Sequence, residues 1–109
     1  MANTFKLKTK ANVGVPTVGI YTAPAATTTV VIGITMANTS GSGVNVGVGI
    51  TRAGTTEDIK LLKNAPLPQG SSLEFMAGNK VVLEATDTLT VDSDVNNSVD
   101  TALTIMEIT

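Results

Sequence analysis

Apolar and polar residues alternate along most of this chain, and this period of two constrains its fold more than any other feature. In residues 44–50 (VNVGVGI) every second side chain is apolar, and residues 27–37 (TTTVVIGITMA) form the most apolar strand-like segment. Successive side chains of a β-strand point to opposite faces, so such a pattern predicts strands with one buried face. The 18 Thr, 13 Val and 7 Ile residues support this, because β-branched side chains suit a pleated surface.

Eight or nine short strands are expected, separated by turn-forming residues. They lie near residues 5–10, 18–21, 27–37, 44–50, 57–63, 72–76, 80–84, 88–92 and 101–108. Residues 57–63 are compatible with a helix or a strand, and a strand is favoured because the segment is short and flanked by turns. Turn signals every ~8–12 residues are typical of antiparallel sandwiches and barrels. We therefore predict an all-β chain, an antiparallel β-sandwich of the jelly-roll or Ig-like type.

The sandwich is expected to be a single domain over residues 1–109, in which residues 1–12 form an N-terminal arm or an edge strand. Two prolines predict that residues 64–70 (NAPLPQG) are irregular. The Gly-Asn pair at 78–79 predicts a tight turn that joins strands 72–76 and 80–84 as a hairpin. Gly47 and Gly49 leave one face of strand 44–50 nearly bare, which predicts close packing against it.

Catalytic and cofactor-binding equipment is sparse. The chain has no Cys and no His, which excludes Cys/His zinc sites, thiol nucleophiles, disulfides and imidazole bases. The glycines at 41–49 do not match a phosphate-binding loop, and no helix is expected to follow them. Neighbouring acids such as Glu57 and Asp58 would point to opposite faces of a strand. We expect no enzymatic activity, no cofactor and no catalytic residue.

Residues 92–98 (DSDVNNS) have oxygen-bearing side chains at alternate positions, as calcium loops do. The twelfth position from Asp92 is Leu103 rather than a bidentate Glu, and the flanking segments are predicted strands. We therefore interpret this segment as a solvated loop with Asx-turns and predict no metal site, with weak calcium binding as the alternative.

The charge pattern limits the class of partner. The net charge of −2 argues against nucleic acid, which is bound by basic surfaces. No apolar stretch approaches the ~20 residues of a spanning helix, so we expect no membrane contact. Residues 1–10 lack the apolar segment of a secretory signal, which predicts synthesis in the cytoplasm. Residues 1–63 hold six basic and two acidic residues, whereas 64–109 hold one and seven. This split indicates either two solvated faces or complementarity between copies.

Lys6, Lys8 and Lys10 alternate with Phe5 and Leu7, so the first strand has one cationic and one apolar face. Lysines on an edge strand discourage unwanted strand pairing, and that is one interpretation of the stripe. The other is an N-terminal strand that docks on an acidic neighbour. Nucleic-acid contact is disfavoured because no aromatic cluster is available for base stacking.

Several segments resemble small virion structural proteins of tailed bacteriophages. The similarity lies in Met1–Lys6, Ile20–Val31, Met36–Ser42, Leu61–Glu74, Gly78–Glu84 and Asp87–Val91, which cover most of the chain. The resemblance implies a compact β-sandwich built into a phage particle in many copies. It implies no residue-level site.

The hypothesis from sequence is a non-enzymatic structural component of a tailed-phage virion, specifically a capsid decoration or cement protein. Its partners would be further copies of itself and other virion proteins, such as the major capsid protein or tail and neck proteins. The alternatives are a neck, collar, tail or fibre-attachment accessory and, from another class, a carbohydrate-binding module. The predicted interaction residues are Phe5, Lys6, Lys8 and Lys10 on the first strand, Asn38 and Ser40 in loop 38–43, and Pro66 and Pro68 in segment 64–70.

Overall fold

A computed structural model of the chain describes residues 3–54, 57–75 and 80–109, whose regular elements are all strands. The strands are β1 (Asn3–Val13), β2 (Val18–Thr22), β3 (Thr28–Asn38), β4 (Val44–Thr51), β5 (Asp58–Leu67), β6 (Ser72–Phe75), β7 (Val81–Leu83), β8 (Thr88–Ser93) and β9 (Val99–Ile108). In these residues we find no helix long and apolar enough to cross a membrane. The all-β prediction is confirmed.

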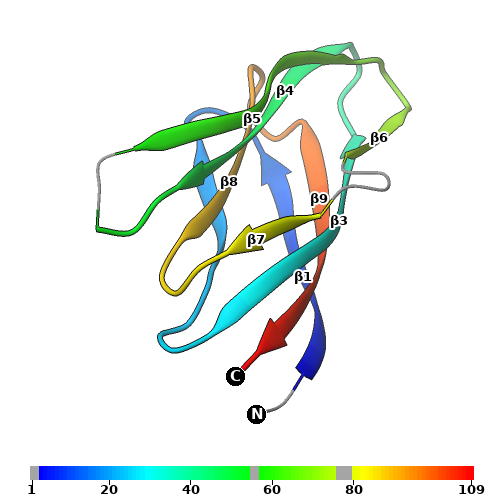
Figure 1. The fold of residues 1–109 in the computed structure, drawn as a ribbon. Helices are drawn as coiled ribbons and strands as arrows, with labels where there is room; N and C mark the ends of the chain where they lie inside the picture. Colours follow the sequence, from blue (N-terminus) through cyan, green and yellow to red (C-terminus); the bar gives the residue numbers. More distant parts are fainter. Residues whose placement is uncertain (1–2, 55–56, 76–79) are drawn as a thin grey trace.

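The strands form two antiparallel sheets that pack face to face (Figure 1). Sheet A has the order β1-β9-β3-β6, with β7 also paired to β3, and sheet B has the order β2-β8-β4-β5. The pairing is nested: β4 with β5, β3 with β6 and β7, β2 with β8, and β1 with β9. One long hairpin rolled into two layers gives this arrangement, which is a jelly-roll β-sandwich.

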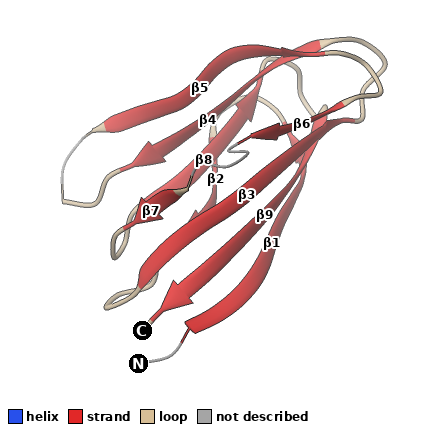
Figure 2. Cartoon of the chain, turned by 45° about the vertical axis from the view of Figure 1, so that its right-hand side comes forward, coloured by secondary structure: helices blue, strands red, loops and turns tan. Residues whose placement is uncertain are grey.

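The first and last strands are neighbours in sheet A. β9 lies between β1 and β3, and its register runs from Asn3 opposite Ile108 to Val13 opposite Val99. Figure 2 shows β1, β9 and β3 side by side, with the two termini together at one end of the sheet.

The core lies between the two sheets and follows the predicted alternation. Val44, Val46, Val48 and Ile50 of β4 are all buried. On β9, Leu103 and Ile105 are fully buried, while Ile108 lies on the opposite face and is partly exposed. The other large side chains without solvent contact are Val31, Ile34, Met36, Leu83, Leu89, Val91 and Val99.

The hairpin predicted between residues 72–76 and 80–84 is wrong. β6 pairs with Ile34–Ala37 and β7 with Thr29–Val31, both on the same side of β3 and both antiparallel to it. β6 and β7 therefore follow one another along β3 as two parts of one interrupted edge. The Gly-Asn turn expected at 78–79 lies outside the described residues.

Residues 64–70 are also not irregular throughout, because β5 continues to Leu67 and Pro66 is paired with Asn45. Proline is tolerated on an edge strand, where its missing N–H can face away from the neighbouring strand. β5 is such an edge, and its pairing with β4 is interrupted by register shifts opposite Val46–Val48 and Val48–Gly49.

The bare face of β4 is closely covered, as its glycines predicted. A Cβ atom at Gly49 would lie 2.8 Å from the Ile59 carbonyl oxygen and 3.1 Å from Thr90 Oγ1. At Gly47 it would lie 2.7 Å from Asp92 Oδ1. The irregular backbone of β5 and two side chains of β8 thus occupy the space that side chains on β4 would need.

We expect the Gly49→Ala variant to lower the free energy of unfolding by about 1–3 kcal/mol, because its methyl group would collide with backbone rather than with a movable side chain. Urea unfolding followed by circular dichroism measures the change. Gly33→Ala is the matched control, since a Cβ there meets nothing within 4 Å, and it should change stability by less than about 1 kcal/mol. Equal stability of the two variants would contradict this account of β4.

Candidate assembly surface

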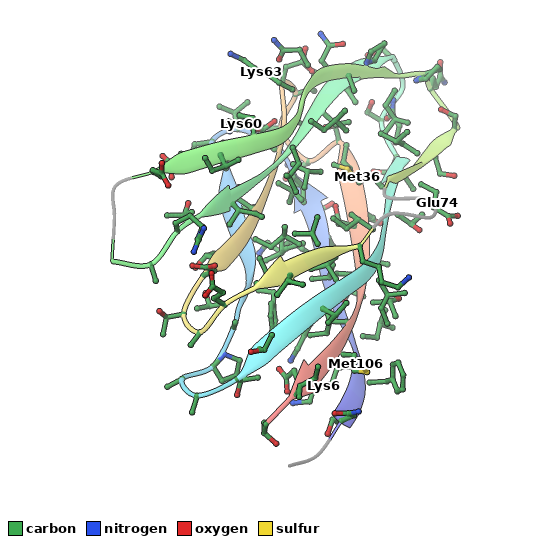
Figure 3. The ribbon with its side chains drawn as sticks, in the orientation of Figure 1. Lys6, Met36, Lys60, Lys63, Glu74 and Met106 are labelled. Carbon is green, nitrogen blue, oxygen red and sulfur yellow. The ribbon has the colours of Figure 1, made fainter. Side chains whose placement is uncertain are left out.

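The face of sheet A that points away from sheet B, here called the outer face, carries an apolar row across four strands. Phe5 on β1 is opposite Met106 on β9, Met106 is opposite Val30 on β3, and Val30 is opposite Val82 on β7. Phe5 is 69% exposed and Val82 55%, and Leu7, two residues along β1, is 65% exposed. Figure 3 shows Met106 on this side of the sheet. Exposed and contiguous apolar side chains are typical of interaction surfaces, which makes the outer face a candidate.

A shallow hollow of about 340 Å³ lies farther along the same strands. It is lined chiefly by small side chains, which are Thr9, Ala11, Thr35, Ala37 and Ala102. Lys10 and Asp100 also line the hollow, and the Asp100 carboxylate accepts a hydrogen bond from the Asn12 N–H at 3.0 Å. The outer face therefore combines a raised apolar row with a depression of small residues.

Between the apolar row and the hollow lies a third row of residues, which are small or polar apart from Leu7. Leu7 is opposite Thr104, and Thr104 is opposite Gly33. The next row places Thr9, Ala102, Thr35 and Glu74 side by side on β1, β9, β3 and β6. Threonine hydroxyls and apolar side chains can be buried in an interface at a lower cost than charges.

Lys6, one of the predicted interaction residues, turns toward the interior. Its Nζ atom is 2.9 Å from Oε1 of Glu107, a residue that is only 7% exposed. The Tyr21 hydroxyl donates a 2.5 Å hydrogen bond to Glu107 Oε2, and Thr29 Oγ1 is 2.8 Å from the same hydroxyl. This Tyr21–Glu107–Lys6 cluster joins β2 of sheet B to β1, β3 and β9 of sheet A.

The cluster shifts the acidity of its members. Burial, reinforced by the hydrogen bond to Glu107, raises the pKa of Tyr21 to about 12. The hydrogen bond from Tyr21 and the ammonium group of Lys6 hold the pKa of Glu107 below its ordinary value of 4.5 despite burial. Lys8 is half-buried on the same side of β1 and also helps to lower the pKa of Glu107, whereas Lys10 is exposed.

A second buried carboxylate, Asp87, closes the turns beside β4 and β8. Burial alone would raise its pKa, but the N–H groups of Ala53 and Glu84 donate to it at 2.9 and 3.1 Å, and Arg52 Nε lies 3.1 Å away. These contacts outweigh burial and lower the pKa of Asp87. Both buried acids are therefore held in their charged forms.

The remaining predicted contact residues meet at one end of the sandwich. Asn38 is buried, and its Nδ2 atom donates to the carbonyls of Ser42 and Leu67 at 2.9 and 3.0 Å. Its Oδ1 atom accepts from the Ser40 hydroxyl at 2.7 Å, so Asn38 organises the loop from inside. Pro66 and Pro68 are exposed on either side of Leu67. The assembly role of these residues stays a prediction.

The 92–98 loop uses its oxygens within the fold. Asp94 Oδ1 accepts from the Asn45 N–H at 2.9 Å, Asn96 Oδ1 from the Val15 N–H at 3.1 Å, and Asp92 Oδ2 from the Thr17 hydroxyl at 3.1 Å. Across the described residues, no three His, Cys, Asp or Glu side chains group as metal ligands would. The loop thus joins the segment between β1 and β2 to β4 and to the end of β8.

Sequence reasoning found Phe5 but missed Leu7, Val30, Val82 and Met106. Alternation places Phe5 and Leu7 on one face of β1, but it does not tell which face is buried. The sequence signal that could have identified the buried face is Glu107. A carboxylate in an otherwise apolar strand needs a cation on the neighbouring strand, which turns the lysines of β1 inward and Phe5 and Leu7 outward.

Neither the protein-family models nor the curated protein sequences contain a match to this chain. Solved structures do match. A chain of the capsid of Helicobacter pylori bacteriophage KHP30 aligns with a TM-score of 0.58 at 10% identity, covering 100% of this chain and 94% of that one. A Bacillus endospore appendage protein, described as a disulfide-linked pilus, aligns with a TM-score of 0.58 at 15% identity over 99% and 87%.

The infectious bursal disease virus particle also contains a similar fold. A chain from its Gx strain gives a TM-score of 0.58 at 16% identity, and 96% of the present chain covers 32% of that longer one. At such identities the likeness shows a shared jelly-roll fold and nothing about individual residues.

Alkaline titration tests the buried cluster directly, because Tyr21 is the only tyrosine and the chain has no tryptophan. We expect tyrosinate absorbance to appear with a midpoint of about 12 in the folded protein and near 10 in denaturant. Glu107→Gln should lower the folded midpoint, because it removes a negative charge and acceptor beside the phenol. An unchanged midpoint in that variant would contradict the proposed contact.

Acid should destabilise the fold, since the pKa values of Glu107 and Asp87 are lower in the folded than in the unfolded state. Their stabilising contribution is complete above the unfolded pKa values of 4.5 and 3.8 and is lost as the pH falls through the folded ones. We expect the urea-unfolding free energy to decline below about pH 4.5, and less steeply in Glu107→Gln. Glu74→Gln, which removes an exposed acid of β6, is the matched control for the loss of one carboxylate.

Proposed function

We propose that this chain is a non-enzymatic structural component of a tailed-phage virion, and more specifically a capsid decoration or cement protein present in many copies. The observation that carries the proposal is the full-length match to a chain in a bacteriophage capsid structure. All of this chain aligns with 94% of that one, so the two share a fold over similar lengths. The phage resemblance of the sequence segments supports a virion structural role but assigns no station on the particle.

The surface of the protein is suited to assembly rather than to a reaction. The outer face of sheet A offers exposed Phe5 and Leu7 with small neighbours, and the acids Glu107 and Asp87 are committed to internal contacts. An exposed apolar surface of this kind gains free energy when another protein covers it. Repetition by symmetry multiplies modest contacts of this sort in a particle.

The similar fold of the appendage protein, which forms pili, supports the proposal that this chain assembles in many copies. The disulfide linkage described for those pili cannot apply to this chain. Disulfide links need cysteine, and this chain has none. Cohesion between copies would have to come from non-covalent contacts. A decoration role is preferred to a shaft or fibre role because the chain lacks heptads and long repeats.

Immunogold electron microscopy of intact phage particles that carry an epitope tag on this chain tests the proposal. The C-terminal Thr109 is exposed and is a suitable position for the tag. We expect label distributed over the whole head. Label confined to the neck, tail or fibres would replace the decoration role with the accessory role, and purified particles without label would contradict a virion function.

A further inference from the structure

We infer that the outer face of sheet A binds a second copy of this chain, with the two faces packed in an antiparallel, two-fold arrangement. The inference goes beyond a virion role and does not depend on it. It stands on the shape, chemistry and size of one surface.

The centre of the outer face has no charged residue, and the centre is the part of an interface from which water is excluded. In the rows that contain Phe5, Leu7 and Thr9, the residues on β1, β9 and β3 are all uncharged. The charged groups Asp100 and Glu74 lie toward one end or edge. Apolar and small side chains in the centre with charges at the margin are the pattern of protein interfaces.

The face is also large enough. Strands of 10–11 residues (β1, β3 and β9) and the split edge β6/β7 make it four strands wide. With ~3.3 Å per residue and ~4.8 Å between strands, its area is roughly 600 Å² per copy. Two copies would bury about 1,200 Å² in total, which is the lower end for stable, specific interfaces.

Shape selects a second copy as the occupant. On β1 and β9, Phe5 and Met106 lie two residues to one side of the pair Leu7 and Thr104, and Thr9 and Ala102 lie two residues to the other side. A two-fold axis in the interface, perpendicular to the strands at this middle row, places the large side chains of each copy over the hollow of the other. The face is therefore complementary to itself, as a two-fold interface requires.

The pairs across this interface match in size. Met106 of one copy lies over Ala102 of the second copy, and Phe5 lies over Thr9, where the hollow of about 340 Å³ receives them. An axis parallel to the strands would instead set Met106 on Met106 and Ala102 on Ala102. That arrangement leaves the hollows empty, and unfilled space at an interface forfeits contacts.

Sedimentation equilibrium of the purified chain tests the interface without any virion, so its result is independent of the immunogold experiment. We expect a dimer whose dissociation constant rises at least tenfold in Phe5→Ser and in Leu7→Ser. Both side chains are largely exposed, so the variants should fold, which circular dichroism verifies. Ile59→Ser on β5, also an exposed apolar residue at 42%, is the matched control and should remain dimeric.

Cysteine cross-linking tests the geometry, because the chain has no cysteine of its own. Residue 104 lies on the proposed axis, so Thr104→Cys should form a disulfide with Cys at the same position of the second copy under mild oxidation. Lys63→Cys on β5 lies away from the face and should not. A mixture of Met106→Cys and Ala102→Cys should give the mixed disulfide, with little self-linked Met106→Cys.

Three results would overturn the inference. The first is a chain that stays monomeric at its highest soluble concentration, which would leave the face to a different partner. The second is a dimer that Phe5→Ser and Leu7→Ser do not weaken. The third is efficient self-linking of Met106→Cys, which would require the parallel arrangement.

Discussion

The pairing of β9 between β1 and β3 is the contact on which the rest of the sandwich depends. Its inward residues Leu103 and Ile105 are fully buried, and its two neighbours come from the first third of the chain. Sheet A therefore has no continuous inner face until the last ten residues are in place. Closure of such long loops makes folding slow, and it also means that the two ends of the chain stabilise each other.

The same pairing determines which side of β1 faces solvent. A slip of one residue would turn Phe5 and Leu7 inward and Lys6 outward. The ion pair of Lys6 with Glu107 and the burial of Val13 at the far end of the strand oppose that slip. The buried Glu107 carboxylate thus explains why Phe5 and Leu7 are exposed. It binds Lys6, and because Lys6 alternates with Phe5 and Leu7, these two residues point to the opposite face.

Alternation was sufficient to predict the strands and the sandwich, because burial of one face requires a period of two. It failed where pairing between distant strands overrides local signals. The Gly-Asn pair suggested a hairpin, yet β6 and β7 both use β3 as their partner. The prolines suggested a loop, yet Pro66 lies in β5 because an edge strand tolerates it.

The assembly surface was only partly predictable for a related reason. Lys6, Lys8 and Lys10 were recognised as a stripe, and Phe5 was named with them, but their orientation depends on Glu107, nearly a hundred residues away. Met106 and Val82 become neighbours of Phe5 only through the register of three strand pairs. The alternation of residues along the sequence cannot show which side chains are neighbours across the sheet until the strand order and register are known.

The edges of the two sheets favour association through faces rather than through added strands. β2 is short and has a register shift, β5 has two shifts and a proline, and β6 and β7 are short pieces of a divided edge. β1 is the longest edge, with 11 residues against 10 for β5, and its lysines would have to lose water if another sheet extended it. Because the other edges are short or interrupted and β1 would have to bury its lysines, the outer face of sheet A, which is uncharged at its centre, is the surface whose burial costs least.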